Sequence, residues 1–237
     1  MPIRNHPIRS QFPPFLLFPL LLSSLLLSPI SLTAQSKLEQ TMIRQGLVDI
    51  QKIDPTILVD LKYSTTDNFV GVDVYGDLTR AYLQPMAARK LAQASAYLRQ
   101  QLPDLRLLVY DAARPLSVQQ ILWDTLNVPL KEKAKYVADP KEGSIHNYGC
   151  AVDLTIATAA GKPLDMGTQY DYFGVLAYPP KEDEMLKRGK LTRQQVTNRR
   201  LLRSVMNRAG FSVSTTEWWH FNALSRARAR QTYAIIR

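Results

Sequence analysis

The sequence predicts an α+β fold, a single domain in which a small, mostly antiparallel sheet is flanked by helices. The chain has 237 residues, 46% of them hydrophobic, which suits one domain with a sizeable core. Short apolar segments bounded by turn residues are typical of strands, and two longer segments have the spacing and boundary residues of helices. These elements do not follow the regular strand–helix alternation of a parallel sheet.

Residues 1–34 are predicted to be a secretory signal peptide and residues 35–237 the mature domain. Two arginines within the first nine residues precede an apolar run over 15–27, and small residues place cleavage after Ala34. An uncleaved anchor is the alternative, but the run is short for a bilayer span and contains Pro19. We therefore expect an exported protein, periplasmic or elsewhere in the cell envelope, with no stable membrane span after cleavage.

The first half of the domain is predicted to begin with two short strands, at 47–50 and 57–61, which an Asp-Pro pair separates. A polar and aromatic loop follows at 62–69. The segment 85–102 is predicted as a helix because one proline opens it and another follows its last residue. Alternating apolar residues then predict a strand over 105–111.

The second half is predicted to continue with a serine-capped short helix over 117–126 and a loop or short helix over 127–143. Period-two alternation predicts a strand over 151–157. Residues 167–191 lack periodicity and are predicted to be an excursion over the surface. A Thr-x-x-Gln capping box and a later glycine bound a helix over 193–209. Two short strands are expected after it, and the last one is expected to hold Glu217 to His220.

The composition limits the expected partners and chemistry. The formal net charge is +10, of which the predicted signal peptide carries two positive charges, and it suits an anionic wall, substrate or membrane surface. Nucleic acid is not an expected partner, because the chain is predicted to leave the cytoplasm. Cys150 is the only cysteine, so neither an internal disulfide nor a cysteine-based metal cluster is possible. Strand alternation directs it with Val152 towards the core, which favours an inert thiol over a nucleophile.

Two of the three histidines lie in short motifs that together supply a set of metal ligands. One motif runs from Ser144 through His146 to Asp153, and the other is Glu-Trp-Trp-His, ending at His220. Two imidazoles and one carboxylate leave a zinc site with an open fourth position, where zinc lowers the pKa of water to about 7. A buried structural histidine is the alternative, but two spaced histidines with a spaced Asp and Glu favour metal binding.

The direction of each side chain can be predicted in part. Val152 lies on the core face of its strand, so Asp153 is expected to point the other way, into a cleft. Glu217 lies three residues before His220, and on a flat strand the two would face opposite ways. A bend or a strand start between them is therefore needed. If both converge, Glu217 is the natural general base.

Arg114 follows a predicted strand end in the segment Asp111-Ala-Ala-Arg-Pro. A guanidinium at this point is suited to stabilise the oxyanion of a tetrahedral intermediate. Asp111 either orients Arg114 or caps a turn. Trp218 and Trp219 are expected to form core and cleft wall rather than a cofactor site.

The pattern Ser-x-His-x-x-Gly-x-Ala-x-Asp, followed by Glu-Trp-Trp-His-Phe, resembles the zinc D-alanyl-D-alanine dipeptidases, the type that includes the vancomycin-resistance dipeptidase. The resemblance covers roughly residues 46–222. The metal motif is shared with a wider superfamily that includes D,D-carboxypeptidases and cell-wall endopeptidases, whereas the Trp-Trp pair and the Arg-Pro block point to the dipeptidases. Further similar blocks are 60–63, 67–69, 111–115, 166–171 and 198–211.

The resemblance implies one Zn²⁺ per chain, held by His146, Asp153 and His220, with Glu217 as catalytic base and acid and Arg114 as the transition-state stabiliser. It implies a fold of the D,D-peptidase and hedgehog type and hydrolysis of D-Ala-D-Ala to two D-alanines in cell-wall peptide metabolism. The residues expected to bind substrate are Tyr63, Asp67, Asn68, Phe69, Ser144 and Trp218.

Two other functions stay open at this point. One is a D,D-carboxypeptidase or endopeptidase that acts on longer peptidoglycan peptides. The other is a non-catalytic, zinc-dependent module that binds wall peptides, against which the presence of Glu217 argues. The chain departs from the family pattern by its predicted signal peptide and across about 172–195, a region that could cover the cleft.

Overall fold

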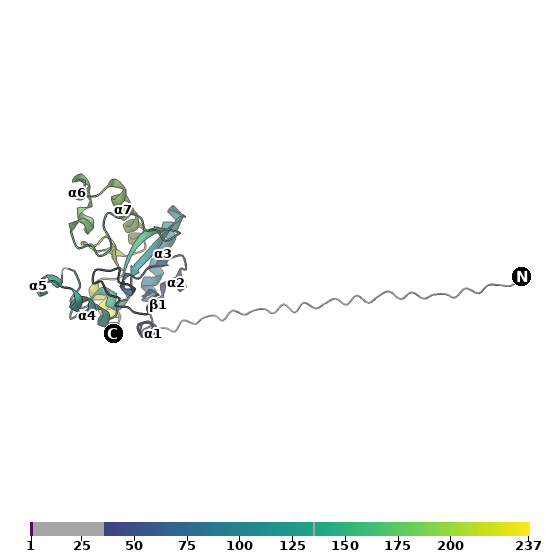
Figure 1. Ribbon diagram of the computed structural model, residues 1–237, viewed down its shortest axis with the longest axis horizontal. Helices are drawn as coiled ribbons and strands as arrows, with labels where there is room; N and C mark the ends of the chain where they lie inside the picture. The colour runs from purple at the N-terminus through teal and green to yellow at the C-terminus, as the bar shows by residue number, and fades with distance from the viewer. Residues whose placement is uncertain (2–35, 135) are drawn as a thin grey trace. The chain divides into compact units, whose positions relative to one another are not determined.

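The computed structural model of the chain describes Met1, residues 36–134 and residues 136–237. The predicted signal peptide therefore lies outside the described residues, apart from Met1. The described residues from 36 to 237 form one compact unit, with the helices and strands arranged as in Figure 1. None of the helices in the described part of the chain combines the length and apolar character that a membrane crossing needs.

A five-stranded sheet organises this unit, and most of its pairs are antiparallel, as predicted. Only the first pair, β2 with β4, is parallel. β4 and β5 form the long central pair, and β7 adds to the far side of β5. In their order across the sheet the strands are β2 (Leu58–Val59), β4 (Leu105–Asp111), β5 (Ala151–Thr158), β7 (His220–Asn222) and β6 (Ser212–Val213). A separate two-stranded antiparallel sheet joins β1 (Val48–Asp49) and β3 (Tyr82–Leu83).

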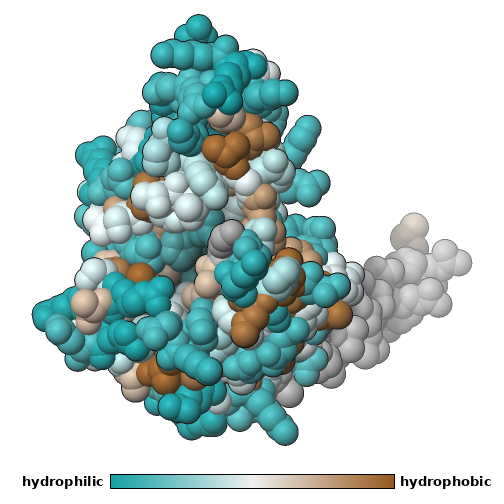
Figure 2. Space-filling model, turned by 90° about the vertical axis from the view of Figure 1, so that its left-hand side faces the viewer, coloured by the Kyte–Doolittle hydropathy of each residue, from teal (hydrophilic) through white to brown (hydrophobic). Residues whose placement is uncertain are grey.

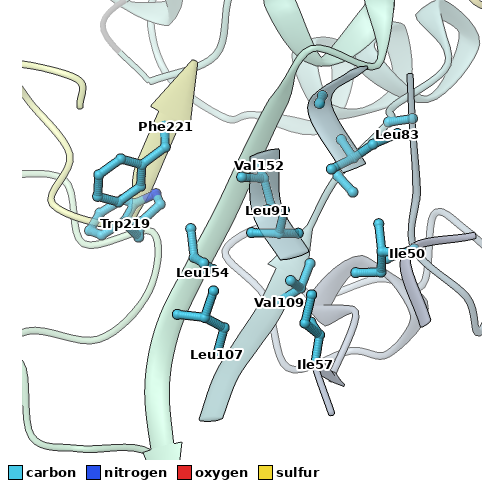
Figure 3. Close-up of a cluster of buried hydrophobic side chains, with 14 of the residues drawn as sticks. Ile50, Ile57, Leu83, Leu91, Leu107, Val109, Val152, Leu154, Trp219 and Phe221 are labelled. Atoms are coloured by element: carbon cyan, nitrogen blue, oxygen red, sulfur yellow. The ribbon is translucent and has the colours of Figure 1, made fainter. Parts of the chain in front are cut away.

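The main hydrophobic core lies against one face of the sheet. Leu107 and Val109 of β4 lie beside Val152 and Leu154 of β5, and all four are buried (Figure 3). Burial of apolar side chains is the main favourable contribution to folding, so period-two alternation fixes which face of β5 packs inward. The prediction that the core face includes Val152 is confirmed, and Asp153 points away from this core.

Two long helices pack against the sheet and closely match their predicted limits. α3 (Pro85–Gln101) begins at its proline, and α7 (Arg193–Arg208) begins with a capping box in which Thr192 and Gln195 exchange hydrogen bonds. In Figure 1, α6 and α7 lie together at the top of the view, and α4 and α5 lie at the lower left. The other helices are α1 (Lys37–Arg44), α2 (Ile50–Ile53), α4 (Leu116–Thr125), α5 (Leu130–Lys133), α6 (Glu182–Lys187) and α8 (Arg226–Thr232). The 3₁₀ turns are η1 (Lys62–Ser64), η2 (Ile145–Tyr148), η3 (Val175–Ala177) and η4 (Pro179–Lys181).

Three segments differ from their predictions. The strand expected over 47–50 ends early, because the Asp49 side chain accepts a hydrogen bond from the Gln51 backbone and so caps α2. The strand expected over 57–61 is reduced to Leu58–Val59. The excursion at 167–191 contains regular structure after all, namely η3, η4 and α6.

The surface of the molecule is mainly hydrophilic on the face that Figure 2 shows, and its hydrophobic side chains lie in small separate groups. Cys150 is fully buried, in a small cluster with Tyr148 and Ala229 rather than in the main core. Burial raises the pKa of its thiol to about 12, which agrees with the predicted inert role.

Candidate active site

The position of His146 is fixed by the 3₁₀ turn η2. Ser144 opens this turn, and its hydroxyl accepts a hydrogen bond from the His146 backbone at 3.3 Å, while the Asn147 side chain accepts one from the Ser144 backbone at 2.6 Å. The Asn147 amide also donates to the Arg114 carbonyl at 2.8 Å, which joins η2 to the end of β4. Gly149 ends the turn with φ +65°, a backbone conformation that glycine adopts without strain. The segment from Ser144 to Gly149 therefore holds the imidazole of His146 in a fixed position.

Strand pairing brings the other two predicted ligands together. Asp153 of β5 lies directly opposite His220 of β7, so both side chains leave the same face of the sheet. The distance from His220 Nδ1 to Asp153 Oδ1 is 2.9 Å, and His146 Nε2 lies 3.1 Å from His220 Nδ1 and 3.4 Å from Asp153 Oδ1. The structure thus joins all three predicted ligands in one group that could hold a metal ion.

Hydrogen bonds on the outer side of each imidazole leave the inner nitrogens available as metal ligands. His146 Nδ1 donates to the Ala112 carbonyl at 2.7 Å, and His220 Nε2 donates to Asn222 Oδ1 at 3.0 Å. In the neutral form of both rings, two nitrogen lone pairs and a carboxylate oxygen face one another. A tetrahedral metal site with ligand bonds of about 2.0–2.1 Å has edges of about 3.3 Å, close to the three observed separations. The donor set fits a divalent metal ion.

The electrostatics of the group also favour a bound cation. Burial alone would raise the pKa of Asp153, but the charge and hydrogen bond of His146 and the hydrogen bond of His220 hold it well below its usual range. Burial lowers the pKa of His220, yet the Asp153 carboxylate outweighs that effect and raises it to about 9. The ionised Asp153 thus attracts positive charge to this point.

Glu217 lies beside the ligand group without belonging to it. The strand predicted to hold both Glu217 and His220 is wrong in its extent: β7 begins only at His220, and the two tryptophans before it form a turn. That turn brings Glu217 Oε2 to 3.9 Å from His220 Nδ1, so the two side chains do converge. The Glu217 side chain is 31% exposed to the cleft, and burial within the protein raises its pKa. A carboxylate with a raised pKa is suited to accept a proton.

Arg114 is held rigidly at the edge of the group. Its Nε and Nη2 both donate to Asp111 Oδ2, at 3.0 and 2.5 Å, and its Nη1 donates to Gln119 Oε1 at 2.9 Å. Its Nη2 lies 3.9 Å from Asp153 Oδ2, and its guanidinium lies over the Tyr63 ring at 5.1 Å. Two roles were considered for Asp111, and the structure shows that it orients Arg114.

These side chains line a cleft of about 610 Å³. Three of the residues predicted to bind substrate, Tyr63, Phe69 and Ser144, line it as well. The other three, Asp67, Asn68 and Trp218, line a neighbouring cavity of about 900 Å³ instead, and Phe69 borders both. The structure therefore divides the six predicted residues between two adjoining cavities.

The residues of that second group also have contacts that hold the protein's own loops. Asn68 donates to three backbone carbonyls of the 62–72 loop, and Asp67 pairs with Lys62 at 3.0 Å. The indole of Trp218 donates to Thr168 at 2.8 Å. These contacts hold the loops that line the neighbouring cavity.

Two polar residues of the site were not singled out from the sequence as site residues. Asp171 borders both cavities, accepts a hydrogen bond from the Tyr63 hydroxyl at 2.8 Å, and has φ +56°. Burial and the charge of Asp153 raise the pKa of Asp171 well above its usual range. Tyr170 donates to Asp153 Oδ2 at 3.0 Å and so fixes that carboxylate. The only sequence signal for Asp171 was its place in the similar block 166–171. No local sequence pattern predicts that an aspartate adopts the left-handed backbone conformation.

The chain is similar to known dipeptidases over most of its length. Residues 43–236 match the family described as D-ala-D-ala dipeptidase. The D-alanyl-D-alanine dipeptidase of Escherichia coli is 36% identical over 177 residues, which cover 74% of this chain and 83% of that protein. The enzyme of the same name from Synechocystis sp. is 28% identical over 184 residues, 65% of this chain and 73% of that protein. The D-alanyl-D-alanine dipeptidase of Enterococcus faecium is 26% identical over 203 residues, which cover 74% of this chain and 90% of that protein. The chain therefore belongs to the D-ala-D-ala dipeptidase family, a family of peptidases, as its two histidine motifs predicted.

Proposed function

We propose that this protein hydrolyses D-Ala-D-Ala to two D-alanines with one Zn²⁺ held by His146, Asp153 and His220. The observation that carries the proposal is the convergence of three possible ligand atoms, 2.9–3.4 Å apart, beside Glu217. Bound zinc would supply a Lewis acid and a water of pKa about 7. The segment that matches the family, residues 43–236, contains all four residues.

In this mechanism Glu217 accepts a proton from the attacking water and later donates it to the leaving amine. Its carboxylate lies within reach of the metal ligands but is not among them, which leaves both oxygens able to accept a proton. The raised pKa allows Glu217 to keep that proton until the amide nitrogen leaves, and then to give it to the new amine. One residue thus acts first as base and then as acid.

Arg114 stabilises negative charge on the carbonyl oxygen of the scissile bond. Three of the five guanidinium N–H groups donate to Asp111 and Gln119, so two remain for substrate. Because those contacts fix the plane of the guanidinium before substrate arrives, little reorganisation is needed in the transition state.

Asp171 binds the ammonium group of the dipeptide. It is a buried carboxylate in the cleft, and Tyr63 holds its orientation. The raised pKa of Asp171 reflects the cost of placing one more negative charge near Asp153. A substrate ammonium offsets that cost, whereas a neutral N-terminus does not.

A second candidate function is cleavage of longer wall peptides by D,D-carboxypeptidase or endopeptidase action. The neighbouring cavity of about 900 Å³ favours it, because Phe69 and Asp171 border both spaces and a longer chain has room beyond the cleft. Export to the periplasm, where wall peptides are trimmed and recycled, is part of the proposal and rests on the predicted signal peptide.

The test is a hydrolysis panel with purified protein. D-Ala-D-Ala, its L-isomer and a pentapeptide stem ending in D-Ala-D-Ala are incubated with zinc and with a chelator, and released alanine is measured. We expect chelator-sensitive cleavage of D-Ala-D-Ala that is faster than cleavage of the stem. A faster reaction on the stem favours the second candidate, and zinc-loaded protein that cleaves neither contradicts both. Cell fractionation with a reporter fused at the C-terminus tests export.

A further inference from the structure

Arg226 places a positive charge at the mouth of the catalytic cleft. It is the first residue of α8, and it lines the same cleft as Ser144, His146 and Glu217. Its Nη1 donates to the carbonyl of Gly143 at 2.5 Å, directly before Ser144 in the chain. The guanidinium therefore lies next to the residue that opens the η2 turn.

Packing behind the cleft fixes where this charge lies. Ala229, one turn further along α8, is fully buried in the cluster with Tyr148 and Cys150. Tyr148 belongs to η2, the same turn that carries His146. Because α8 packs on η2, the position of Arg226 is fixed relative to the candidate metal ligands.

Among the described residues, no carboxylate forms an ion pair with Arg226. Arg114, the other arginine of the cleft, gives two hydrogen bonds to Asp111. Asp139 and Glu142 line the same mouth, but the described residues place no carboxylate within ion-pair distance of Arg226. The Gly143 contact uses one of five N–H donors, so the remaining donors face other partners.

A dipeptide brings a carboxylate that needs such a partner. In D-Ala-D-Ala the carboxylate is separated from the scissile nitrogen by one carbon atom, so it must lie close to the metal ligands during cleavage. The hydroxyl of Ser144 accepts from the His146 backbone and has its own proton left to donate. A serine hydroxyl and a guanidinium together form a suitable pair of donors for a carboxylate.

We propose that Arg226 binds the C-terminal carboxylate of the substrate, with Ser144 as second donor, and so restricts cleavage to a bond followed by one terminal residue. The proposal rests on the proposed peptidase function and adds a specificity rule to it. It selects dipeptides and other substrates with a free terminal carboxylate, and it disfavours internal bonds, where that carboxylate is replaced by an amide.

The test compares D-Ala-D-Ala with D-alanyl-D-alaninamide, which has the same scissile bond but no carboxylate. kcat and KM are measured for the wild-type protein and for Arg226→Ala, Arg226→Lys and Arg228→Ala. Arg228 is the matched control, because it lies on the exposed side of α8 and does not line the cleft. All four proteins keep the residues that hold the metal.

We expect Arg226→Ala to lower kcat/KM for the acid about tenfold, mainly through KM, and to leave the amide unchanged. Arg226→Lys should restore part of the loss, since it keeps the charge, and Arg228→Ala should behave as wild type. An equal loss on acid and amide would show that Arg226 only supports the Gly143 loop and would overturn the proposal. So would an unchanged kcat/KM for the acid. Wild-type protein that cleaves neither compound contradicts the proposed function itself, a result separate from these two.

Discussion

His146 Nε2 and His220 Nδ1 approach each other at 3.1 Å, each on the side of its ring opposite the hydrogen bond to Ala112 or Asn222. With both nitrogens unprotonated, their lone pairs would repel each other, and the Asp153 oxygen would add a third acceptor at 2.9 and 3.4 Å. Such a group is stable only when a cation lies among the three atoms, as a proton or as a metal ion. The sequence therefore builds a site whose stability depends on what occupies it.

Zinc is accordingly expected to stabilise the folded protein. Anything that binds the native state but not the unfolded chain raises the unfolding temperature. We expect one equivalent of zinc to raise the Tm, a chelator to reverse the rise, and His220→Ala to abolish it. Asn222→Ala removes only the outer hydrogen bond of His220 and should weaken zinc binding about tenfold. Calorimetric titration of both variants checks this order, and equal affinity in Asn222→Ala and wild type would exclude a role for the outer contact.

Replacement of Glu217 should separate catalysis from metal binding. Glu217→Gln keeps the size of the side chain but removes the proton acceptor, so kcat should fall about a hundred- to ten-thousandfold while zinc stoichiometry stays at one. The Glu217 carboxylate lies outside the ligand group, which is why metal binding should persist. Steady-state kinetics and metal analysis of the same sample provide the check. A variant that retains wild-type turnover would remove Glu217 from the mechanism, and a wild-type protein that binds wall peptides without turnover would favour a binding module.

Local patterns were sufficient to predict the parts of the fold that local rules determine. Alternation along β5 predicted the direction of Asp153, because neighbouring side chains of any strand face opposite ways. The proline at the start of α3 and the capping box of α7 predicted their first residues, because both features act on the helix they begin.

Features that depend on distant contacts could not be predicted in the same way. The convergence of Glu217 and His220 requires β7 to begin at His220, and pairing with β5 sets that start. α6 was missed because it is short and has no clear periodicity. It is held by ion pairs from α7, in which Arg203 donates to Glu182 at 3.1 and 2.7 Å. Sequence order does not show that Arg226 returns to the cleft, since its partner Gly143 lies 83 positions earlier.

Asp171 should determine how tightly the substrate's free amino group is bound. Asp171→Asn keeps the hydrogen bond to Tyr63 within reach but removes the negative charge, so KM for D-Ala-D-Ala should rise about tenfold with little change in kcat. N-acetyl-D-Ala-D-Ala has no ammonium and serves as the matched substrate. On this compound, Asp171→Asn and the wild type should have similar KM values. An equal rise in KM on both substrates would assign Asp171 a purely structural role.

Cys150 should be chemically silent in the folded protein. Its thiol is fully buried, and burial raises its pKa to about 12, so almost no thiolate exists at pH 8. We expect no reaction with a thiol-specific reagent under native conditions and one equivalent of reaction after unfolding in guanidinium. Cys150→Ala should keep wild-type turnover. Rapid labelling of Cys150 in the native protein, together with loss of activity, would instead support a role for Cys150 as a nucleophile.

Arg114 should not tolerate replacement by lysine, although the charge is kept. The guanidinium makes two hydrogen bonds to Asp111 and one to Gln119 while two donors remain for substrate, and the single ammonium of lysine cannot reproduce that planar arrangement. Asp111 is fully buried, so loss of the two guanidinium hydrogen bonds to its Oδ2 also leaves its negative charge less well compensated. The Tyr75 hydroxyl, 2.5 Å from Asp111 Oδ1, then becomes its main remaining donor. We expect Arg114→Lys to lower kcat about a hundredfold or more with a smaller change in KM, because the lost contact acts on the transition state. The Tm and zinc stoichiometry of the same variant separate a catalytic loss from misfolding. A correctly folded, zinc-loaded Arg114→Lys protein with wild-type kcat would show that charge alone is sufficient at this position.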